Sequence, residues 1–227
     1  MNKKRVIKHR RLINIIVRTI ANTLIILSVI LLGVGIWPYL QSEISYDWGR
    51  LIGQVYYVGG DKPTQVSSPL GSIITAPPPL QITPVSTDFG IIIPKIDVNA
   101  SVHGDVDVTN QAAYFEALKH GAAHAKGTVY PGQNGNSFIF AHSTLNFWDI
   151  ARYQAVFTLL RKLEPGDRII TFYKGQRYDY IVKEKKIVDP TDVSSLSPVA
   201  DGRQLTLQTC DPPGTSLKRL LVIAKMD

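Results

Sequence analysis

The sequence has little cysteine: Cys210 is the single one among its 227 residues. No disulfide can therefore form within the chain, which excludes a disulfide-stapled scaffold. A lone thiol is either a small buried hydrophobe or a reactive group, and the count alone does not decide between them. Charge is also scarce, at 19% of residues, while 44% are hydrophobic, which indicates a membrane-embedded part beside a domain with a sizeable core.

Acidic residues are missing from the first part of the chain, where the first carboxylate is Glu43. Seven of the 25 basic residues lie within the first 18 positions, so the formal net charge of +7 belongs to a basic tail at residues 1–18. The remainder carries 18 basic and 18 acidic residues, and this balance argues against nucleic acid as a partner of the domain.

An uncharged run at residues 19–37 follows the tail. A helix of this length spans about 30 Å of hydrocarbon, so we expect a transmembrane anchor over residues 19–40, with Trp37 and Tyr39 at the interface. The positive-inside rule predicts a single-pass protein of the cell membrane with a cytoplasmic N-terminus and an extracytoplasmic C-terminal domain. A cleaved signal peptide is the alternative, but its apolar region is usually shorter and ends at small residues.

Residues 41–88 are the expected juxtamembrane segment and linker. A short amphipathic helix is expected within residues 41–58, and residues 59–88 contain six prolines, three of them consecutive at 77–79. Consecutive prolines favour extended polyproline geometry, which would hold a domain away from the membrane. The alternative is a lid that lies across an active site.

Residues 89–227 show the pattern of a mostly β domain. Short apolar runs bounded by glycine, proline and asparagine predict strands, and few segments have helical spacing. Many short strands with little helix are typical of a closed barrel or a sandwich. The expected strands lie at residues 91–93, 137–140, 168–173, 178–188, 205–210 and 220–224, and the expected short helices at about 112–120 and 150–160.

The strand that ends at Cys210 has two different faces. Side chains alternate along a strand, so Leu205, Leu207 and Thr209 share one face and Cys210 lies on the other with Gln208. The cysteine is therefore on the more polar face, which favours a reactive thiol over a buried spectator.

Three segments carry reactive side chains at strand ends. Residues 206–210 read Thr-Leu-Gln-Thr-Cys, Arg219 begins the next apolar strand, and His142 follows the apolar strand at 137–140. Together these segments resemble the sortase family, and the resemblance covers about residues 90–225. It implies a closed eight-stranded β-barrel that cleaves a sorting signal of the L-P-x-T-G kind between Thr and Gly and joins the Thr to an amine.

The resemblance implies that Cys210, His142 and Arg219 are catalytic and that Thr209 helps to orient the substrate or its oxyanion. The chemistry is consistent with these residue types. A thiolate attacks an amide carbonyl, and an imidazole with a pKa near neutrality protonates the leaving amine. A permanently charged guanidinium stabilises the oxyanion or holds the substrate backbone. For a lone histidine such as His142, a structural role at the strand end is the alternative.

Two further groups of side chains are of types that bind metal ions. His120 and His124 are four residues apart, but Gly121 interrupts a helix there and no third ligand is evident. The acidic residues at 105, 107 and 116 have no diagnostic calcium spacing. We therefore expect no metal and no cofactor.

The resemblance also suggests a type of sortase and its partners. Only about sixteen residues separate the strands ending at Val188 and beginning at Leu205, too few for the long helix that some classes insert there. The 59–88 segment has no Asp-Pro-Trp lid and the chain ends just past the last strand, so we expect a housekeeping or class D/E-like member. The implied partners are surface proteins with a C-terminal sorting signal and an amine on a cell wall precursor or a pilin.

Two other functions stay open at the level of sequence. A catalytically inactive sortase-like domain would act as an extracytoplasmic binding module. An L,D-transpeptidase would place its histidine and cysteine together in one short motif, which this sequence lacks.

Overall fold

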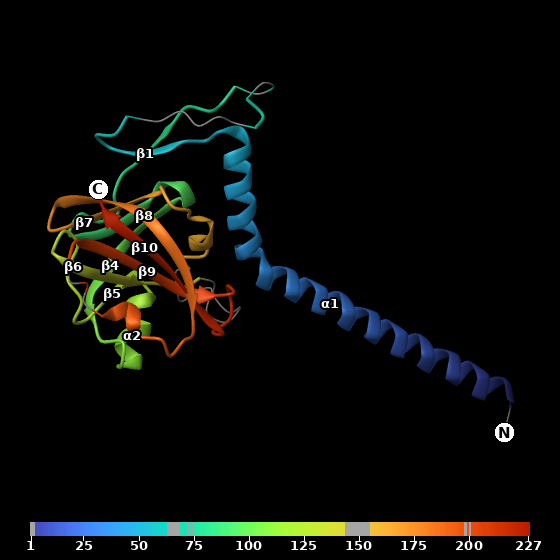
Figure 1. The fold of residues 1–227 in the computed structure, drawn as a ribbon. Coiled ribbons are helices and arrows are strands. Elements are labelled where there is room, and N and C mark those ends of the chain that lie inside the picture. The colour runs from blue at the N-terminus through green and yellow to red at the C-terminus, as the bar shows by residue number, and fades with distance from the viewer. Residues whose placement is uncertain are drawn as a thin grey trace. The chain divides into compact units, whose positions relative to one another are not determined.

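A computed structural model of the chain describes residues 3–62, 69–71, 73, 75–143, 155–197, 199 and 201–227, with side chains from Arg11 onward except at positions 38 and 39. The chain divides into two compact units, Met1–Gln41 and Ser42–Asp227. Helix α1 (Lys3–Ile52) begins in the first unit and ends in the second (Figure 1).

The first unit contains a candidate membrane span. Among the described residues, Arg11–Trp37 of α1 is the one helical stretch long and apolar enough to cross a membrane, with a mean hydropathy of 2.3 and no buried residues. The finding is one of length and composition. It includes the uncharged run expected to be the anchor.

The second unit is built on a closed eight-stranded barrel, which confirms the expected fold (Figure 1). Its strands follow one another around the barrel in the order β10-β8-β7-β3-β4-β5-β6-β9. In chain order they are β3 (Phe89–Ile93), β4 (Val98–Val106), β5 (Ala122–Ala125), β6 (Gly135–Phe140), β7 (Arg168–Tyr173), β8 (Gln176–Val188), β9 (Arg203–Asp211) and β10 (Lys218–Met226).

Local sequence explains several of the strand ends. Pro94 ends β3 and begins the 3-10 helix η1 (Pro94–Ile96), because proline cannot donate a ladder hydrogen bond. Lys174 and Gly175 both have positive φ, 50° and 76°, and form the two-residue turn between β7 and β8. Asn110 caps helix α2 (Gln111–Leu118) by accepting hydrogen bonds from two backbone N–H groups of its first turn. These outcomes agree with the strands expected at residues 168–173 and 178–188 and with the helix expected near residue 112.

Alternating side chains fill the barrel interior. One large cluster contains the inward residues of most strands, including Ile91, Ile139, Leu207 and Val222. Phe157 and Leu160, from the segment before the 3-10 helix η2 (Leu160–Lys162) and from its first residue, are fully buried in the same cluster. The interior is therefore a packed core, and functional side chains have to lie on the outer faces or at the strand ends.

The second compact unit begins at Ser42, so it contains most of the 41–88 segment, and the expected start of the catalytic domain at residue 89 stays a prediction. Strand β1 (Tyr56–Val58) pairs in parallel with β2 (Leu80–Ile82), and this small sheet packs on outward residues of β3 and β7. Val58 and Ile82 are buried there against Ile92, Ile170 and Phe172. Burial of these apolar side chains stabilises the docking of β1 and β2 on the barrel. The proline content of the segment gave no indication of these two strands.

Ion pairs add to this docking. Asp61 accepts hydrogen bonds from Arg168 and Arg177 of the barrel at 2.7 and 2.9 Å. At the end of α1, Glu43 pairs with Arg161 and Lys162.

One further expectation falls partly outside the described residues. Of the helix expected at about 150–160, residues 150–154 lie outside the described residues, and the following ones form turns and then η2.

Candidate active site

Cys210 and Arg219 are direct neighbours on two adjacent strands. Cys210 is the penultimate residue of β9, Arg219 is the second residue of β10, and the antiparallel register pairs the two. Paired residues of this kind point to the same face with Cα atoms about 5 Å apart. Because Leu207 and Val222 point into the core, alternation places Cys210 and Arg219 on the outer face, as the sequence predicted for the cysteine.

His142 reaches the same level from the other side of β9. Strand β6 runs parallel to β9 with Phe140 opposite Gln208, and the Ala141 N–H donates to the Gln208 carbonyl at 3.1 Å. His142 therefore follows Phe140 by the same two residues by which Cys210 follows Gln208. Neighbouring strands lie about 4.8 Å apart, so the order β6-β9-β10 brings the histidine, the cysteine and the arginine to the same end of these three strands. The N–H of Phe157 donates to the His142 carbonyl at 2.9 Å and fixes the backbone there.

Thr209 faces the barrel interior, with 4% of its surface exposed. Its hydroxyl donates to the carbonyl of Ala141 at 2.8 Å, which ties the cysteine strand to the residue before His142. A substrate contact at this position would therefore use the backbone of Thr209, and its role toward the substrate stays a prediction.

The guanidinium of Arg219 is held by backbone carbonyls rather than by a carboxylate. It donates to Ser216 at 3.3 Å and to Lys218 at 3.2 Å. Among the described residues no Asp or Glu forms an ion pair with Arg219, whereas the neighbouring Lys218 pairs with Asp189 at 2.6 Å. The positive charge beside Cys210 is thus not neutralised by these residues and can act on negative charge that develops during a reaction at Cys210.

An apolar patch adjoins Cys210 on the outer face, and the sequence analysis missed it. Phe140 and Leu221 are its buried centre, and Tyr114, Val188 and Leu196 pack on them while partly exposed. Val188 pairs with Arg219 in the β8–β10 register. The sequence did contain an indication of this patch. Consecutive apolar residues at the end of β6 point to alternate faces, which indicates a strand that is covered on both faces.

The loop that carries Leu196 is anchored to the same face. The amide of Asn136 donates to the carbonyl of Ser195, in the 3-10 helix η3 (Ser194–Leu196), at 2.8 Å. The hydroxyl of Thr206, two positions along the face from Gln208, donates to the Asn136 side-chain oxygen at 2.8 Å. Polar residues of β6 and β9 therefore hold one wall of the patch in place.

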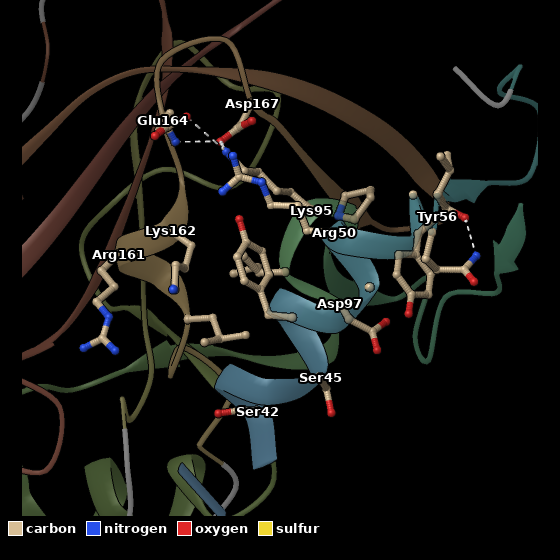
Figure 2. A pocket seen from close by; sticks show the side chains of 18 residues that line it. Ser42, Ser45, Arg50, Tyr56, Lys95, Asp97, Arg161, Lys162, Glu164 and Asp167 are labelled. Carbon is tan, nitrogen blue, oxygen red and sulfur yellow. Dashed lines mark hydrogen bonds and ion pairs between the residues drawn. The ribbon is translucent and has the colours of Figure 1, made fainter. Parts of the chain in front are cut away.

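A separate cavity of about 740 Å³ lies between the end of α1, η1 and the segment around η2 (Figure 2). Asp97 and Tyr56 project into the same part of it (Figure 2), and burial raises the pKa of both groups. Lys95 bridges to Asp167 at 2.8 Å on another wall. The lining includes none of the three expected catalytic residues, so this cavity and the candidate active site are different places.

His124, one of the two histidines with a spacing that could suggest metal binding, is packed in the barrel and hydrogen-bonded to neighbouring residues. His124 is fully buried in β5, where its Nε2 lies 3.0 Å from both the Val129 carbonyl and the Thr128 hydroxyl. Burial lowers the pKa of His124. Across the part of the chain that the structure describes, no group of three His, Cys, Asp or Glu residues is arranged to hold a metal ion.

Comparison with known proteins supports one family. The family model of the sortase domain matches residues 91–227. Sortase A of Listeria monocytogenes is 27% identical over 137 residues, which are 60% of this chain and 55% of that protein. Sortase D of Bacillus subtilis is 26% identical over 136 residues, which are 59% of this chain and 60% of that protein. The chain thus spans little more than half the length of these curated relatives.

Solved structures of the same family have a similar fold. Sortase A from Corynebacterium diphtheriae, in a lid mutant, superposes with a TM-score of 0.52 at 28% identity over 63% of this chain and 70% of that one. A Clostridium perfringens Sortase D5 transpeptidase gives 0.51 at 25% identity over 64% of this chain and 82% of that one.

Proposed function

The chain belongs to the sortase family, and we propose that it is a membrane-anchored cysteine transpeptidase acting on an L-P-x-T-G-like sorting signal. The observation that carries this proposal is the strand order β6-β9-β10, which brings His142, Cys210 and Arg219 to the same end of three neighbouring strands, on the outer face of the barrel. A nucleophile flanked by an acid/base group and a cation is the arrangement that acyl transfer needs.

The first half of the reaction forms a thioester. The Cys210 sulfur attacks the carbonyl carbon of the Thr–Gly peptide bond, and the carbonyl electron pair moves to oxygen. As the tetrahedral intermediate collapses, the C–N bond breaks and His142 gives a proton to the departing glycine amine. The Thr carbonyl is then bonded to the sulfur of Cys210.

The second half returns the enzyme to its starting state. An incoming amine attacks the thioester carbonyl and loses a proton to His142. The C–S bond breaks, an amide joins Thr to the acceptor, and Cys210 leaves as the thiolate. Water in place of the amine would give hydrolysis.

Arg219 contributes its fixed charge to both halves. Two backbone carbonyls hold its guanidinium next to Cys210, and no described carboxylate neutralises it. A preorganised cation lowers the energy of the thiolate and of the oxyanion in each tetrahedral intermediate. The apolar patch around Phe140 and Leu196 would receive the apolar residues that precede the scissile bond.

The remaining parts of the chain support a surface-protein anchoring role. The apolar span in α1 would hold the protein in the cell membrane with the barrel on the extracytoplasmic side. The partners would be surface proteins with a C-terminal sorting signal and an amine on a cell wall precursor or a pilin.

The test uses the full chain in detergent micelles with a quenched L-P-x-T-G-type peptide library and an amine acceptor. We expect cleavage and an acceptor-linked product, and we expect Cys210→Ala to abolish both while its circular dichroism spectrum stays unchanged. Absence of cleavage by a folded wild-type protein whose Cys210 also resists thiol reagents would favour the inactive binding module.

A further inference from the structure

Tyr114 lies over the outer face that carries Cys210. Its ring stacks on that of Phe140 with centroids 5.1 Å apart and planes 8° from parallel. Helix α2 positions the ring from the side of β4 and β5, since Ala117 and Leu118 are buried and Asn110 caps the first turn. A short capped helix with a buried face presents its tyrosine in one orientation.

The strand register places this ring close to the reacting sulfur. Phe140 pairs with Gln208, and Gln208 is the residue next to Cys210 on the same face. The Tyr114 hydroxyl lies close enough to Cys210 and Arg219 for the charges of both to act on its pKa. Tyr114 thus approaches Cys210 from the β6 side, whereas Arg219 approaches it from β10.

The Tyr114 hydroxyl keeps its proton at neutral pH and can donate a hydrogen bond. Burial raises its pKa above the usual value near 10, and the negative charge of Cys210 raises it further, while Arg219 acts in the opposite direction. Within the described residues the hydroxyl makes no hydrogen bond, although the ring beneath it is packed. A protonated hydroxyl beside the nucleophile is therefore available to a bound peptide.

We propose that Tyr114 donates a hydrogen bond to a backbone carbonyl of the peptide segment that becomes the acyl group on Cys210. Extended peptides present backbone carbonyls along their length, and these need donors when they leave water. Tyr114 on one side and Arg219 on the other would then hold the peptide on both flanks of Cys210. Tyr114 is a substrate-contacting residue in this account, and the inference rests on the proposed function.

Substitution of Tyr114 by Phe separates the hydroxyl from the ring, because phenylalanine keeps the stacking on Phe140. The full-length chain in detergent would be assayed with the peptide that the wild type cleaves best. We expect kcat/KM for the peptide to fall on the order of tenfold, the value of one hydrogen bond to a buried acceptor. The kcat/KM for the amine acceptor should not change, because this ratio depends only on the reaction of the acceptor with a thioester already formed.

Single-turnover kinetics give a readout that a structural role would not move. Y114F should slow formation of the thioester on Cys210 and leave its breakdown by amine within about twofold, with an unchanged melting temperature. Y178F is the matched control. The Tyr178 hydroxyl donates a hydrogen bond to the side chain of Gln176, on the same strand β8, at 2.7 Å. Y178F should behave as the wild type.

The outcomes distinguish this inference from the proposed function. A wild type that forms the thioester together with a Y114F variant of equal acylation rate overturns the role of Tyr114 and leaves the transpeptidase intact. A fall in Y114F that appears equally in acylation and in breakdown by amine also overturns the role in peptide binding. A wild type that forms no thioester overturns the proposed function and this inference with it.

Discussion

Two outer faces of the same barrel differ in what packs on their outward-pointing apolar residues. The face of β3 and β7 points Ile92, Ile170 and Phe172 outward, and the chain's own β1–β2 sheet covers them. The face of β6, β9 and β10 also points Phe140 and Leu221 outward, and the side chains that pack on this cluster, Tyr114, Val188 and Leu196, stay partly exposed. Cys210 and Arg219 lie on the same face and are partly exposed as well.

The difference shows how a barrel with a packed interior acquires a site. Outward apolar residues on a strand need a cover, because exposed apolar patches are costly. Where the chain supplies the cover, the result is stability. Where the covering side chains stay partly exposed beside reactive ones, as Tyr114, Val188 and Leu196 do, a peptide can pack on them.

The largest effects on the open face should come from the two residues that flank Cys210. His142→Ala is expected to lower kcat/KM about 10³-fold, because no other described side chain at this end of the strands is placed to protonate the leaving amine. Arg219→Lys should lower it less, since the charge remains but the fixed fork of donors is lost. Steady-state assays with the full chain check both.

His120→Ala is the control for the histidine substitution, because 63% of its side chain is exposed and it lies on the loop after α2. Its activity should equal that of the wild type. A His142→Ala variant with more than a tenth of the wild-type rate would contradict the assigned acid/base role.

The covered face should respond in stability rather than in activity. Ile82→Ala removes a buried side chain, 8% exposed, that packs on β3 and β7. We expect the free energy of unfolding to fall by about 2 kcal/mol, with kcat/KM per folded molecule within twofold of the wild type. Denaturant titration and the peptide assay measure the two quantities.

Ile187→Ala is a matched control, because Ile187 lies on a barrel strand but is 62% exposed. Its free energy of unfolding should change by less than about 0.5 kcal/mol. A large loss of activity in Ile82→Ala without a loss of stability would mean that the two faces are coupled.

Sequence pattern was sufficient for the elements whose signal is local. Alternation placed Cys210 on the face opposite Leu207, and short apolar runs located the strand before Pro94 and the two strands that flank the Lys174–Gly175 turn. Periodicity does not report which strands become neighbours. The pairing of β6 with β9 is parallel and joins residues about 70 apart, so only the resemblance to a family linked His142 to Cys210.

The same limit explains why the sequence predicted a linker at residues 41–88 and did not predict strands β1 and β2 within it. Strands β1 and β2 have three residues each, too few for a periodic signal, and prolines surround the second. Their burial depends on Ile92 and Phe172, which are distant in sequence. Tyr114 was missed for a similar reason, since its importance comes from stacking on a residue of another element.

The smallest expected effect concerns acid stability on the covered face. Burial of Asp61 raises its pKa, but Arg177 and Arg168 outweigh this effect, so the pKa lies below the usual value. A carboxyl with a lowered folded-state pKa stabilises the fold above its unfolded pKa near 4, and this stabilisation is lost as pH falls through the folded value. The free energy of unfolding should therefore decline below about pH 4.

Asp61→Asn should flatten that decline, as measured by denaturant titration between about pH 2 and pH 6. Asp201→Asn, a change at an exposed residue of the loop before β9, should preserve it. Equal acid sensitivity in all three proteins would remove Asp61 from the account of this face.

The most direct test of the central claim is to trap the reaction without an amine acceptor. The full chain is mixed with the preferred peptide, quenched in acid and analysed by intact mass and peptide mapping. We predict one acyl group per chain, ending at the Thr of the signal, attached to Cys210 and released by hydroxylamine as a thioester should be. Cleavage of the peptide without an adduct on Cys210, or an adduct on another residue, would contradict the account.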